Sequence, residues 1–264
     1  MPANVLKKIY EEDYLTDYSE EEWIRMCEGW CSEPGGVYRK VSALAEPLID
    51  NNDPLMEIGC GIGCFLSEWQ KKGYRTVGID PGPRAARIAR ERYQLEIIED
   101  YANERSLREW HGRCGGVFAF EVIEHVVSPR EFIRQCAACL KPGGVIALST
   151  PNFAMYEKLG RYYLDVDRQE HIQFFTPKTM ETLLVYEGFE IVELSLTQSM
   201  LPGEILQKKL TPHVFQSPLW QIGRRFEATQ RFKRFVLGFL NGRRTAGTGA
   251  DGMNIMVVAK KGTV

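Results

Sequence analysis

The chain has 264 residues, which is enough for one large α/β domain or for one domain with an appended lobe. With 44% apolar residues, 26% charged residues and a formal net charge of −2, its composition gives no general reason to expect nucleic acid as a partner. No apolar run is as long as a membrane span, no signal-peptide pattern opens the chain, and the seven cysteines fit reduced thiols, so we expect a cytoplasmic protein.

Residues 1–50 come before the first motif and form a predicted N-terminal helical lid. Aromatic residues are interleaved with acidic ones, and a helical pattern runs from Val37 to Ile49. The segment can pack as a helical layer on the edge of the core, or it can place aromatic rings over a ligand, and one segment can do both. The aromatic residues are Tyr10, Tyr14, Tyr18, Trp23 and Trp30.

The most informative stretch runs from Leu55 to Leu66 and reads LMEIGCGIGCFL. Its first four residues suit a buried strand, three glycines follow, and apolar residues then recur at helical spacing. A strand, a glycine turn and a helix start are typical of a nucleotide-binding α/β unit, because the ligand lies against bare backbone and helix N–H groups. The glycines are Gly59, Gly61 and Gly63.

The spacing of these glycines argues against a dinucleotide. A G-x-G-x-x-G turn would place its last glycine at position 64, where this chain has Cys64. Thr76 to Asp80 reads as a second strand that ends in a carboxylate. Such a carboxylate can accept both hydroxyls of an adenosyl ribose, so Asp80 supports a nucleoside ligand. Alternatively, Asp80 caps the helix that follows Pro81.

A second strong stretch, Val117 to Val126, reads VFAFEVIEHV. Its buried strand, Val117 to Phe120, brings three polar residues to its C-terminal end, where α/β folds place ligands. These residues are Glu121, Glu124 and His125.

Further elements surround that stretch. A third strand is predicted from Glu96 to Glu99, and Ser128 to Glu131 reads as a capping box with proline at the first helical position. The helix ends before a turn, Leu140 to Gly144, and a strand follows from Val145 to Ser149.

Five features follow one another over about residues 50–195: the glycine turn, Asp80, EVIEHV, LKPGG and STPN. Together they closely resemble the class I S-adenosylmethionine (SAM) methyltransferases. The resemblance implies a Rossmann-like α/β fold with a seven-stranded mixed sheet, ordered 3-2-1-4-5-7-6 with the last strand antiparallel, and with helices on both faces. We accordingly predict a lid at 1–50, a SAM-binding core at 51–199, a basic helical cap at 200–252, and a final strand with a tail at 253–264.

The resemblance also implies where SAM binds. In that family the acidic residue before the glycines, here Glu57, lies near the methionine end of SAM, where a carboxylate can meet the ammonium group. The segment after the third strand contacts adenine, and the N-terminal segment covers the active site. We therefore expect SAM as the cofactor, bound by Glu57, Gly59, Cys60, Gly61, Gly63, Asp80, Pro81, Asp100, Tyr101, Phe120 and Glu121.

The loop that contains His171 comes before a predicted helix, Lys178 to Tyr186, and a strand, Phe189 to Leu194. It should lie beside the C-terminal ends of strands four and five. His171 is therefore the candidate general base, because an imidazole can accept a hydroxyl proton near neutral pH. Alternatively, His171 only fixes the loop through hydrogen bonds. His125 and Glu121 complete the predicted catalytic set.

Glu121, Glu124, His125 and His171 together resemble the metal site of magnesium- or manganese-dependent small-RNA 2′-O-methyltransferases. A divalent ion held there could lower the pKa of a hydroxyl and align it with the sulfonium. Many relatives carry the Glu-His pair without a metal. We predict chemistry without a metal and keep Mg²⁺ at these four residues as the alternative.

Met200 to Gly252 separates the last two predicted strands and should lie over the acceptor side of the pocket. Between Gly203 and Ala246, nine Lys or Arg and two Glu give a local charge of +7. A solvated helix face over a packed apolar stripe would explain this pattern. The functional alternatives are recognition of a phosphate-bearing acceptor, such as a nucleotide sugar or lipid-linked glycan, or peripheral contact with an anionic membrane.

We predict a SAM-dependent methyltransferase that moves a methyl group to an oxygen of a small molecule or glycan and releases S-adenosylhomocysteine (SAH). The sulfonium already carries the activation, so the protein must add positioning and proton removal. Three alternatives stay open: a metal-dependent RNA 2′-O-methyltransferase, an N-methyltransferase, and a protein that binds SAM without catalysis.

Overall fold

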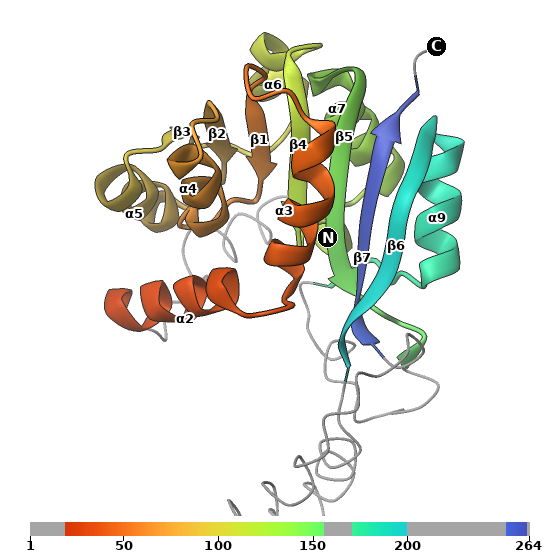
Figure 1. Cartoon of the computed structure of the whole chain (residues 1–264), viewed down its shortest axis with the longest axis horizontal. Coiled ribbons are helices and arrows are strands. Elements are labelled where there is room, and N and C mark those ends of the chain that lie inside the picture. The colour runs from red at the N-terminus through yellow and green to blue at the C-terminus, as the bar shows by residue number, and fades with distance from the viewer. Residues whose placement is uncertain (1–18, 156–170, 200–251, 263–264) are drawn as a thin grey trace, which may run out of the picture.

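The computed structural model describes residues 19–155, 171–199 and 252–262. Their strands form one seven-stranded sheet in the order β3-β2-β1-β4-β5-β7-β6 (Figure 1). The strands are β1 (Leu55–Ile58), β2 (Thr76–Ile79), β3 (Glu96–Ile98), β4 (Cys114–Phe120), β5 (Leu140–Pro151), β6 (Phe189–Ser199) and β7 (Gly252–Lys261). The first five strands in this order, β3, β2, β1, β4 and β5, pair in parallel. Strand β7 runs antiparallel to both of its neighbours, β5 and β6. The predicted order and the reversed last strand are confirmed.

Helices cover both faces of this sheet. They are α2 (Glu20–Ser32), α3 (Val37–Ala45), α4 (Cys64–Lys71), α5 (Pro83–Tyr93), α6 (Glu104–Leu107), α7 (Pro129–Cys139) and α9 (Pro177–Tyr186), with 3-10 turns η2 (Glu46–Leu48), η3 (Arg108–Trp110) and η4 (Ile123–His125). Apolar residues of α7 and α9 pack on one sheet face, and those of α3 and α4 pack on the other. Within the described ranges, no helix has the length and apolar character needed to cross a bilayer.

The central strand β4 shows why the sheet holds the molecule together. All seven of its residues are buried. Val117 and Ala119 point to the core under α7 and α9, and Phe118 and Phe120 point to the core under α3 and α4. Side chains alternate between the two faces of a strand, so a strand covered by helices on both faces needs a continuous apolar run.

Helix ends follow the signals in the sequence. The Ser128 side chain accepts a hydrogen bond from the Glu131 N–H, which is one of the two bonds of the predicted capping box, and proline is the first residue of α7. Thr176 and Thr179 form a full capping box at the start of α9. Gly188, with φ +86°, follows this helix.

The helix predicted from Val37 to Ile49 is shorter than expected. Its α-helical part ends at Ala45 and continues as the 3-10 turn η2. Pro47 lies in that turn. A proline lacks the N–H for an α-helical hydrogen bond, and its ring crowds the carbonyl four residues earlier, so the α-helix stops before it.

The predicted turn from Leu140 to Gly144 is wrong, because these residues belong to β5. Cys114 pairs with Leu140, and Gly116 pairs with Val145, so the register shifts between these two pairs. This irregularity in the pairing takes up the extra residues of β5, and the strand continues beyond it.

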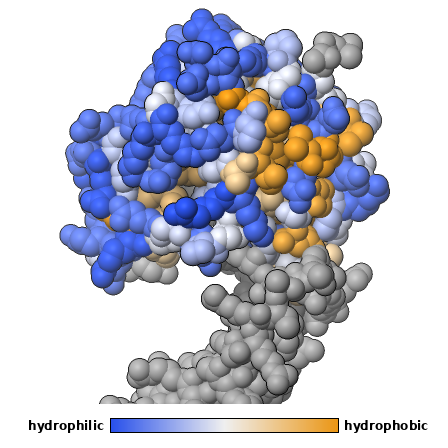
Figure 2. Space-filling model, in the orientation of Figure 1, coloured by the Kyte–Doolittle hydropathy of each residue, from blue (hydrophilic) through white to orange (hydrophobic). Residues whose placement is uncertain are grey.

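The lid and the basic cap remain predictions. Residues 1–18 of the lid, the cap at 200–251, and residues 156–170 lie outside the described residues. The described part of the N-terminal segment forms α2 and α3, and α2 runs below α4 and α5 in Figure 1. Figure 2 shows that the surface over α2, α4 and α5 is largely hydrophilic, whereas apolar surface gathers beside α3.

Candidate functional site

The glycine turn between β1 and α4 has one glycine that faces open space. Gly59, Gly61 and Gly63 all have positive φ, at 70°, 51° and 76°. A Cβ on Gly59 would lie 2.5 Å from the Val122 side chain, and one on Gly63 would lie 2.3 Å from Leu95, so packing and backbone require both glycines. A Cβ on Gly61 would meet no atom of the described residues within 4 Å. Gly61 is therefore the glycine that a ligand can approach.

The Asp80 carboxylate braces this turn. Its Oδ2 accepts a hydrogen bond from the Gly61 N–H at 2.8 Å, and its Oδ1 accepts one from the Gly82 N–H at 2.8 Å. The following helix starts at Pro83 with Gly82 as its N-cap residue, so the alternative that Asp80 caps the helix is wrong. Burial raises the pKa of Asp80, and the two N–H donors oppose that rise. Pro81 lies between the two donors in sequence.

Glu57 at the end of β1 is a buried carboxylate with spare capacity for hydrogen bonds. Its side chain is 3% exposed, and its Oε2 has no hydrogen-bond partner among the described residues. Burial raises its pKa well above the ordinary value, and negative charge at Cys64 and Asp80 adds to the rise. A ligand ammonium group would pair with this carboxylate and offset the cost of burying its charge.

The other predicted cofactor residues lie around the turn and beyond β3. Cys60 is buried, and its Sγ donates to the Gly61 carbonyl at 3.7 Å. Asp100 accepts a hydrogen bond from the Tyr101 N–H at 2.7 Å and pairs with Arg105 at 2.8 Å. The buried Phe120 belongs to the core under α3 and α4. The roles of these residues in cofactor binding stay predictions.

Sequence reasoning missed Tyr38, whose ring packs against one residue after the glycine turn and one at the end of β4. Its ring is 5.4 Å from that of Phe65 and 4.8 Å from that of Phe120. Burial raises the pKa of its phenol, and the carboxylates of Glu57 and Glu121 raise it further. Its position in the amphipathic stretch of α3 was visible, but helical periodicity does not separate a core ring from one beside a site.

Glu121, directly after β4, is held in an uncommon backbone conformation. Its φ is +54°, a left-handed conformation that costs energy for a residue with a side chain. Its Oε1 accepts hydrogen bonds from Ser149 Oγ at 2.6 Å and from Asn254 Nδ2 at 2.9 Å. These partners come from β5 and β7, and sequence reasoning missed both because sheet pairing brings them together.

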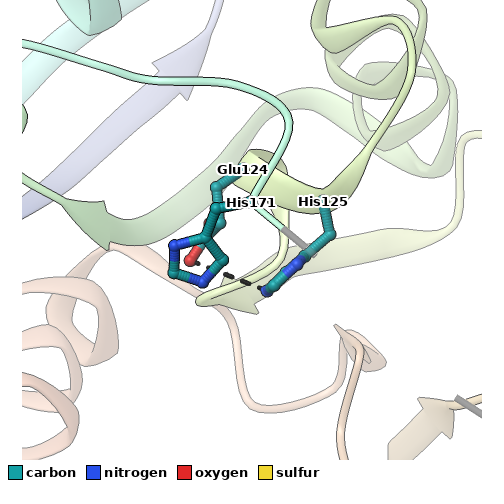
Figure 3. Close-up of side chains that lie close together, drawn as sticks. All are labelled: Glu124, His125 and His171. Atoms are coloured by element: carbon teal, nitrogen blue, oxygen red, sulfur yellow. Dashed lines mark ion pairs between the residues drawn. The ribbon is translucent and has the colours of Figure 1, made fainter. Parts of the chain in front are cut away.

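Glu124, His125 and His171 form a compact trio at the C-terminal ends of β4 and β5 (Figure 3). The two imidazole rings are 4.8 Å apart, His125 Nε2 lies 3.9 Å from Glu124 Oε1, and potential ligand atoms of the three residues lie within 4.8 Å of one another. Glu121, the fourth residue of the metal alternative, is not part of this group as described. The trio can accept a proton or offer nitrogen and oxygen ligands to a cation.

Glu124 holds the trio in place. Its side chain is 1% exposed, and its Oε2 accepts a hydrogen bond from Thr150 Oγ1 at 3.0 Å. Its carbonyl accepts two more, from the N–H groups of Ile172 and Gln173, both at 3.0 Å. The second pair of bonds ties the loop that carries His171 to η4, so the predicted approach of His171 to His125 has a structural cause.

Apart from Asn254, the residues of the site described above lie within one recognisable domain. A family model described as a methyltransferase domain matches residues 31–194. The chain belongs to the class I SAM-dependent methyltransferases. Membership implies SAM as the cofactor. A ligand with an ammonium group and a ribose fits three features of the site: the open side of Gly61, the buried carboxylate of Glu57 and the carboxylate of Asp80 directly after β2.

The curated relatives match this chain only in part. The ubiquinone biosynthesis O-methyltransferase of Nitrobacter winogradskyi is 33% identical over 156 residues, which cover 53% of this chain and 58% of the relative. The protein of that name from Xanthomonas axonopodis is 33% identical over 121 residues, which cover 42% of this chain and 47% of the relative. The chain thus spans about half the length of these curated relatives.

A solved structure shares its fold. The SAM-dependent methyltransferase from Archaeoglobus fulgidus superimposes with a TM-score of 0.57 at 19% identity, covering 90% of this chain and 99% of that chain. At this identity the likeness shows the fold alone.

Glu57→Gln should weaken SAH binding while stabilising the ligand-free protein. The neutral amide loses a charge-assisted hydrogen bond to the ammonium group, worth about 1.5–3 kcal/mol, or roughly 10- to 150-fold in Kd. Folding raises the pKa of Glu57. The protonated side chain therefore contributes its full stability to the folded protein below the unfolded-state pKa. This stability is lost as the pH rises through the raised pKa of the folded protein. The variant avoids this loss, so its Tm without ligand should exceed that of the wild type at neutral pH. Titration calorimetry with SAH and a thermal melt measure both effects, and an unchanged Kd would contradict the role of Glu57.

Gly61→Ala and Gly63→Ala form a matched pair that separates ligand approach from packing. The Gly61→Ala variant should lose about 1 kcal/mol of stability from its left-handed backbone and should bind SAH at least tenfold less tightly, by about 1.4 kcal/mol. The Gly63→Ala variant should lose about 2–4 kcal/mol of stability, because its Cβ also collides with Leu95. Denaturant melts and SAH titration distinguish them. If the two variants lost the same SAH affinity and the same stability, this result would contradict the assignment of Gly61 to the ligand side.

Proposed function

We propose that this protein transfers the methyl group of SAM to a hydroxyl oxygen of a small molecule or glycan and releases SAH. The observation that carries this proposal is the contact between two imidazoles and a buried carboxylate, Glu124, at the strand edge that also carries the glycine turn. A hydroxyl needs a proton acceptor as its oxygen attacks. Two relatives are named ubiquinone biosynthesis O-methyltransferases, which supports an oxygen acceptor.

The chain's own residues would position the reactants and remove a proton. When bound, SAM supplies a methyl group that its sulfonium already activates. His171 would accept the hydroxyl proton while the new oxygen–carbon bond forms and the sulfur–carbon bond breaks. His125, whose ring contacts that of His171, lies beside the Glu124 carboxylate, which would stabilise an imidazolium. Thr150 fixes that carboxylate by its hydrogen bond.

A divalent cation at the same trio is a second candidate arrangement. Potential ligand atoms of Glu124, His125 and His171 lie within 4.8 Å of one another, a spacing that one ion could bridge. The cation would lower the pKa of the acceptor hydroxyl and reduce the need for a base. The two arrangements differ in their response to a chelator.

A label-partition assay tests the acceptor. The full-length protein and methyl-tritiated SAM are added to an extract of the source cells, with and without EDTA, and the label is followed into small-molecule, glycan, lipid, RNA and protein fractions. We expect label in the small-molecule or glycan fraction that survives EDTA. Label in RNA that disappears with EDTA would contradict the proposal, and so would SAH binding without label in any fraction.

His171→Gln should lower kcat by about 10²–10⁴ and leave SAH affinity unchanged, because the base acts on the acceptor rather than on the cofactor. Wild-type activity should fall as the pH is lowered, since a protonated imidazole cannot accept a proton, and this dependence should weaken in the variant. His111→Gln is the matched control, because His111 is exposed and lies outside the trio. Rate measurements across pH check both effects, and a His171 variant with wild-type kcat would disprove the role.

A further inference from the structure

Three cysteines from two helices gather beside the glycine turn. Cys27 and Cys31 are one helical turn apart on α2, and Cys64 is the first residue of α4. In the same apolar cluster, Trp23 of α2 packs with Ile62 of the glycine turn. The three thiols therefore lie where α2 meets the segment that is expected to hold SAM.

Two of these thiols share an opening to solvent. Cys31 and Cys64 line one cleft of about 290 Å³, together with acidic and basic side chains that include Glu28 and Lys71. Cys64 is only 7% exposed, so the cleft is its route to solvent. A lining with both signs of charge suits a small zwitterionic thiol or disulfide. Cys27 is not among the residues that line the cleft.

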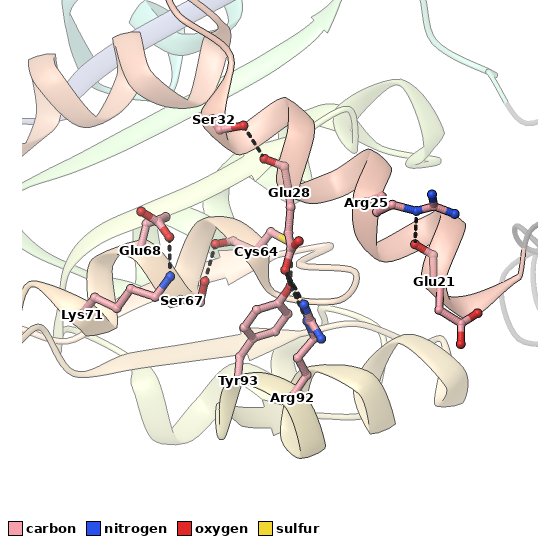
Figure 4. Close-up of polar contacts among 10 residues, drawn as sticks. All are labelled: Glu21, Arg25, Glu28, Ser32, Cys64, Ser67, Glu68, Lys71, Arg92 and Tyr93. Carbon is pink, nitrogen blue, oxygen red and sulfur yellow. Dashed lines mark hydrogen bonds and ion pairs between the residues drawn. The ribbon is translucent and has the colours of Figure 1, made fainter.

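Polar contacts hold the side chains around the opening that leads to Cys64 (Figure 4). Cys64 Sγ lies 3.3 Å from the Tyr93 hydroxyl, which donates a hydrogen bond to Glu28 at 2.9 Å. Arg92 pairs with the same Glu28 carboxylate at 2.8 Å. These contacts link α5 to α2 across the opening.

The three thiols differ in their readiness to ionise. The neighbouring thiols of Cys27 and Cys31 lower the pKa of the Cys64 thiol, against the effect of burial, and its place at a helix N-terminus works in the same direction. The same contacts raise the pKa of Cys27 and of Cys31. A nucleophilic thiolate thus lies next to thiols that can resolve a mixed disulfide.

The arrangement favours exchange between two sulfurs over a metal site. In the described part of the chain, Glu124, His125 and His171 are the group whose ligand atoms converge closely enough for an ion. The three sulfurs do not form such a group among those residues.

We propose that Cys64 and Cys31 form a thiol–disulfide exchange site that ties α2 to the glycine turn. The Cys64 thiolate attacks one sulfur of a low-molecular-weight disulfide, such as oxidised glutathione, and one glutathione leaves as its thiolate. Cys31 then gives up its proton, its sulfur attacks Cys64 Sγ, and the second glutathione leaves. Two protein thiols lose two electrons and two protons, and one oxidised glutathione becomes two reduced molecules.

The cross-link has a consequence for the cofactor. Because α2 packs on Ile62 of the glycine turn, a covalent tie between α2 and α4 holds the helix against that turn. The cofactor then enters and leaves more slowly, as expected when a covering element cannot move away. This consequence rests on membership of the methyltransferase family and does not depend on the identity of the methyl acceptor.

Treatment of the full-length protein with oxidised glutathione tests the site. Mass spectrometry should show a loss of two hydrogen atoms, and peptide mapping should show one Cys31–Cys64 disulfide. The buried Cys136 and Cys139 should stay reduced as an internal control. The dissociation rate constant of SAH should fall about fivefold, a typical coupling between two sites, and dithiothreitol should restore it.

Three variants assign the sulfurs. Cys31→Ser should stop at a mixed disulfide on Cys64, and Cys64→Ser should not react at the wild-type rate. Cys27→Ser is the matched control, since it changes the neighbouring thiol of the same helix and should still give the Cys31–Cys64 disulfide. Thermal melts of the reduced proteins check that each variant folds. Loss of two hydrogens in Cys31→Ser, wild-type reaction of Cys64→Ser, or unchanged SAH dissociation after oxidation would overturn the proposal.

Discussion

The site depends on two hydrogen bonds from backbone N–H groups to one carboxylate. Asp80 accepts from Gly61 and Gly82, and so joins the turn after β1 to the start of α5. The turn can take this path because Gly59 and Gly63 adopt positive φ and leave room for neighbouring side chains. The brace keeps the open side of Gly61 facing away from the core.

A second buried carboxylate organises the other half of the site. Glu124 accepts a side-chain hydrogen bond from β5 and two backbone bonds from the loop after residue 170, so three separate segments meet at one residue. His125 and His171 come together because of these bonds. Glu121, directly after β4, plays a similar part, because it joins β5 and β7 through Ser149 and Asn254. Buried polar networks of this kind restrict the site to one arrangement when their members are satisfied.

The buried acids of the cofactor half work against stability until a ligand arrives. Burial raises the pKa of both Glu57 and Asp80, so their ionised forms are disfavoured in the folded chain. A ligand ammonium group would reverse that preference at Glu57. These buried carboxylates therefore lower the stability of the ligand-free fold at the place where ligand binding can recover it. Such a compromise between stability and binding is common at functional sites.

By itself, the sequence determined the features that depend on neighbours along the chain. Glycine spacing predicted the turn, apolar runs predicted β1 and β4, and caps predicted the starts of α7 and α9, because local backbone conformation follows from local side chains. Family resemblance supplied the strand order. Only the tertiary structure decided that Asn254 reaches Glu121, that Tyr38 packs against Phe65 and Phe120, and that Cys31 and Cys64 line one cleft. These contacts arise from sheet pairing and helix packing between distant segments, and no local pattern encodes which distant side chain will be the neighbour.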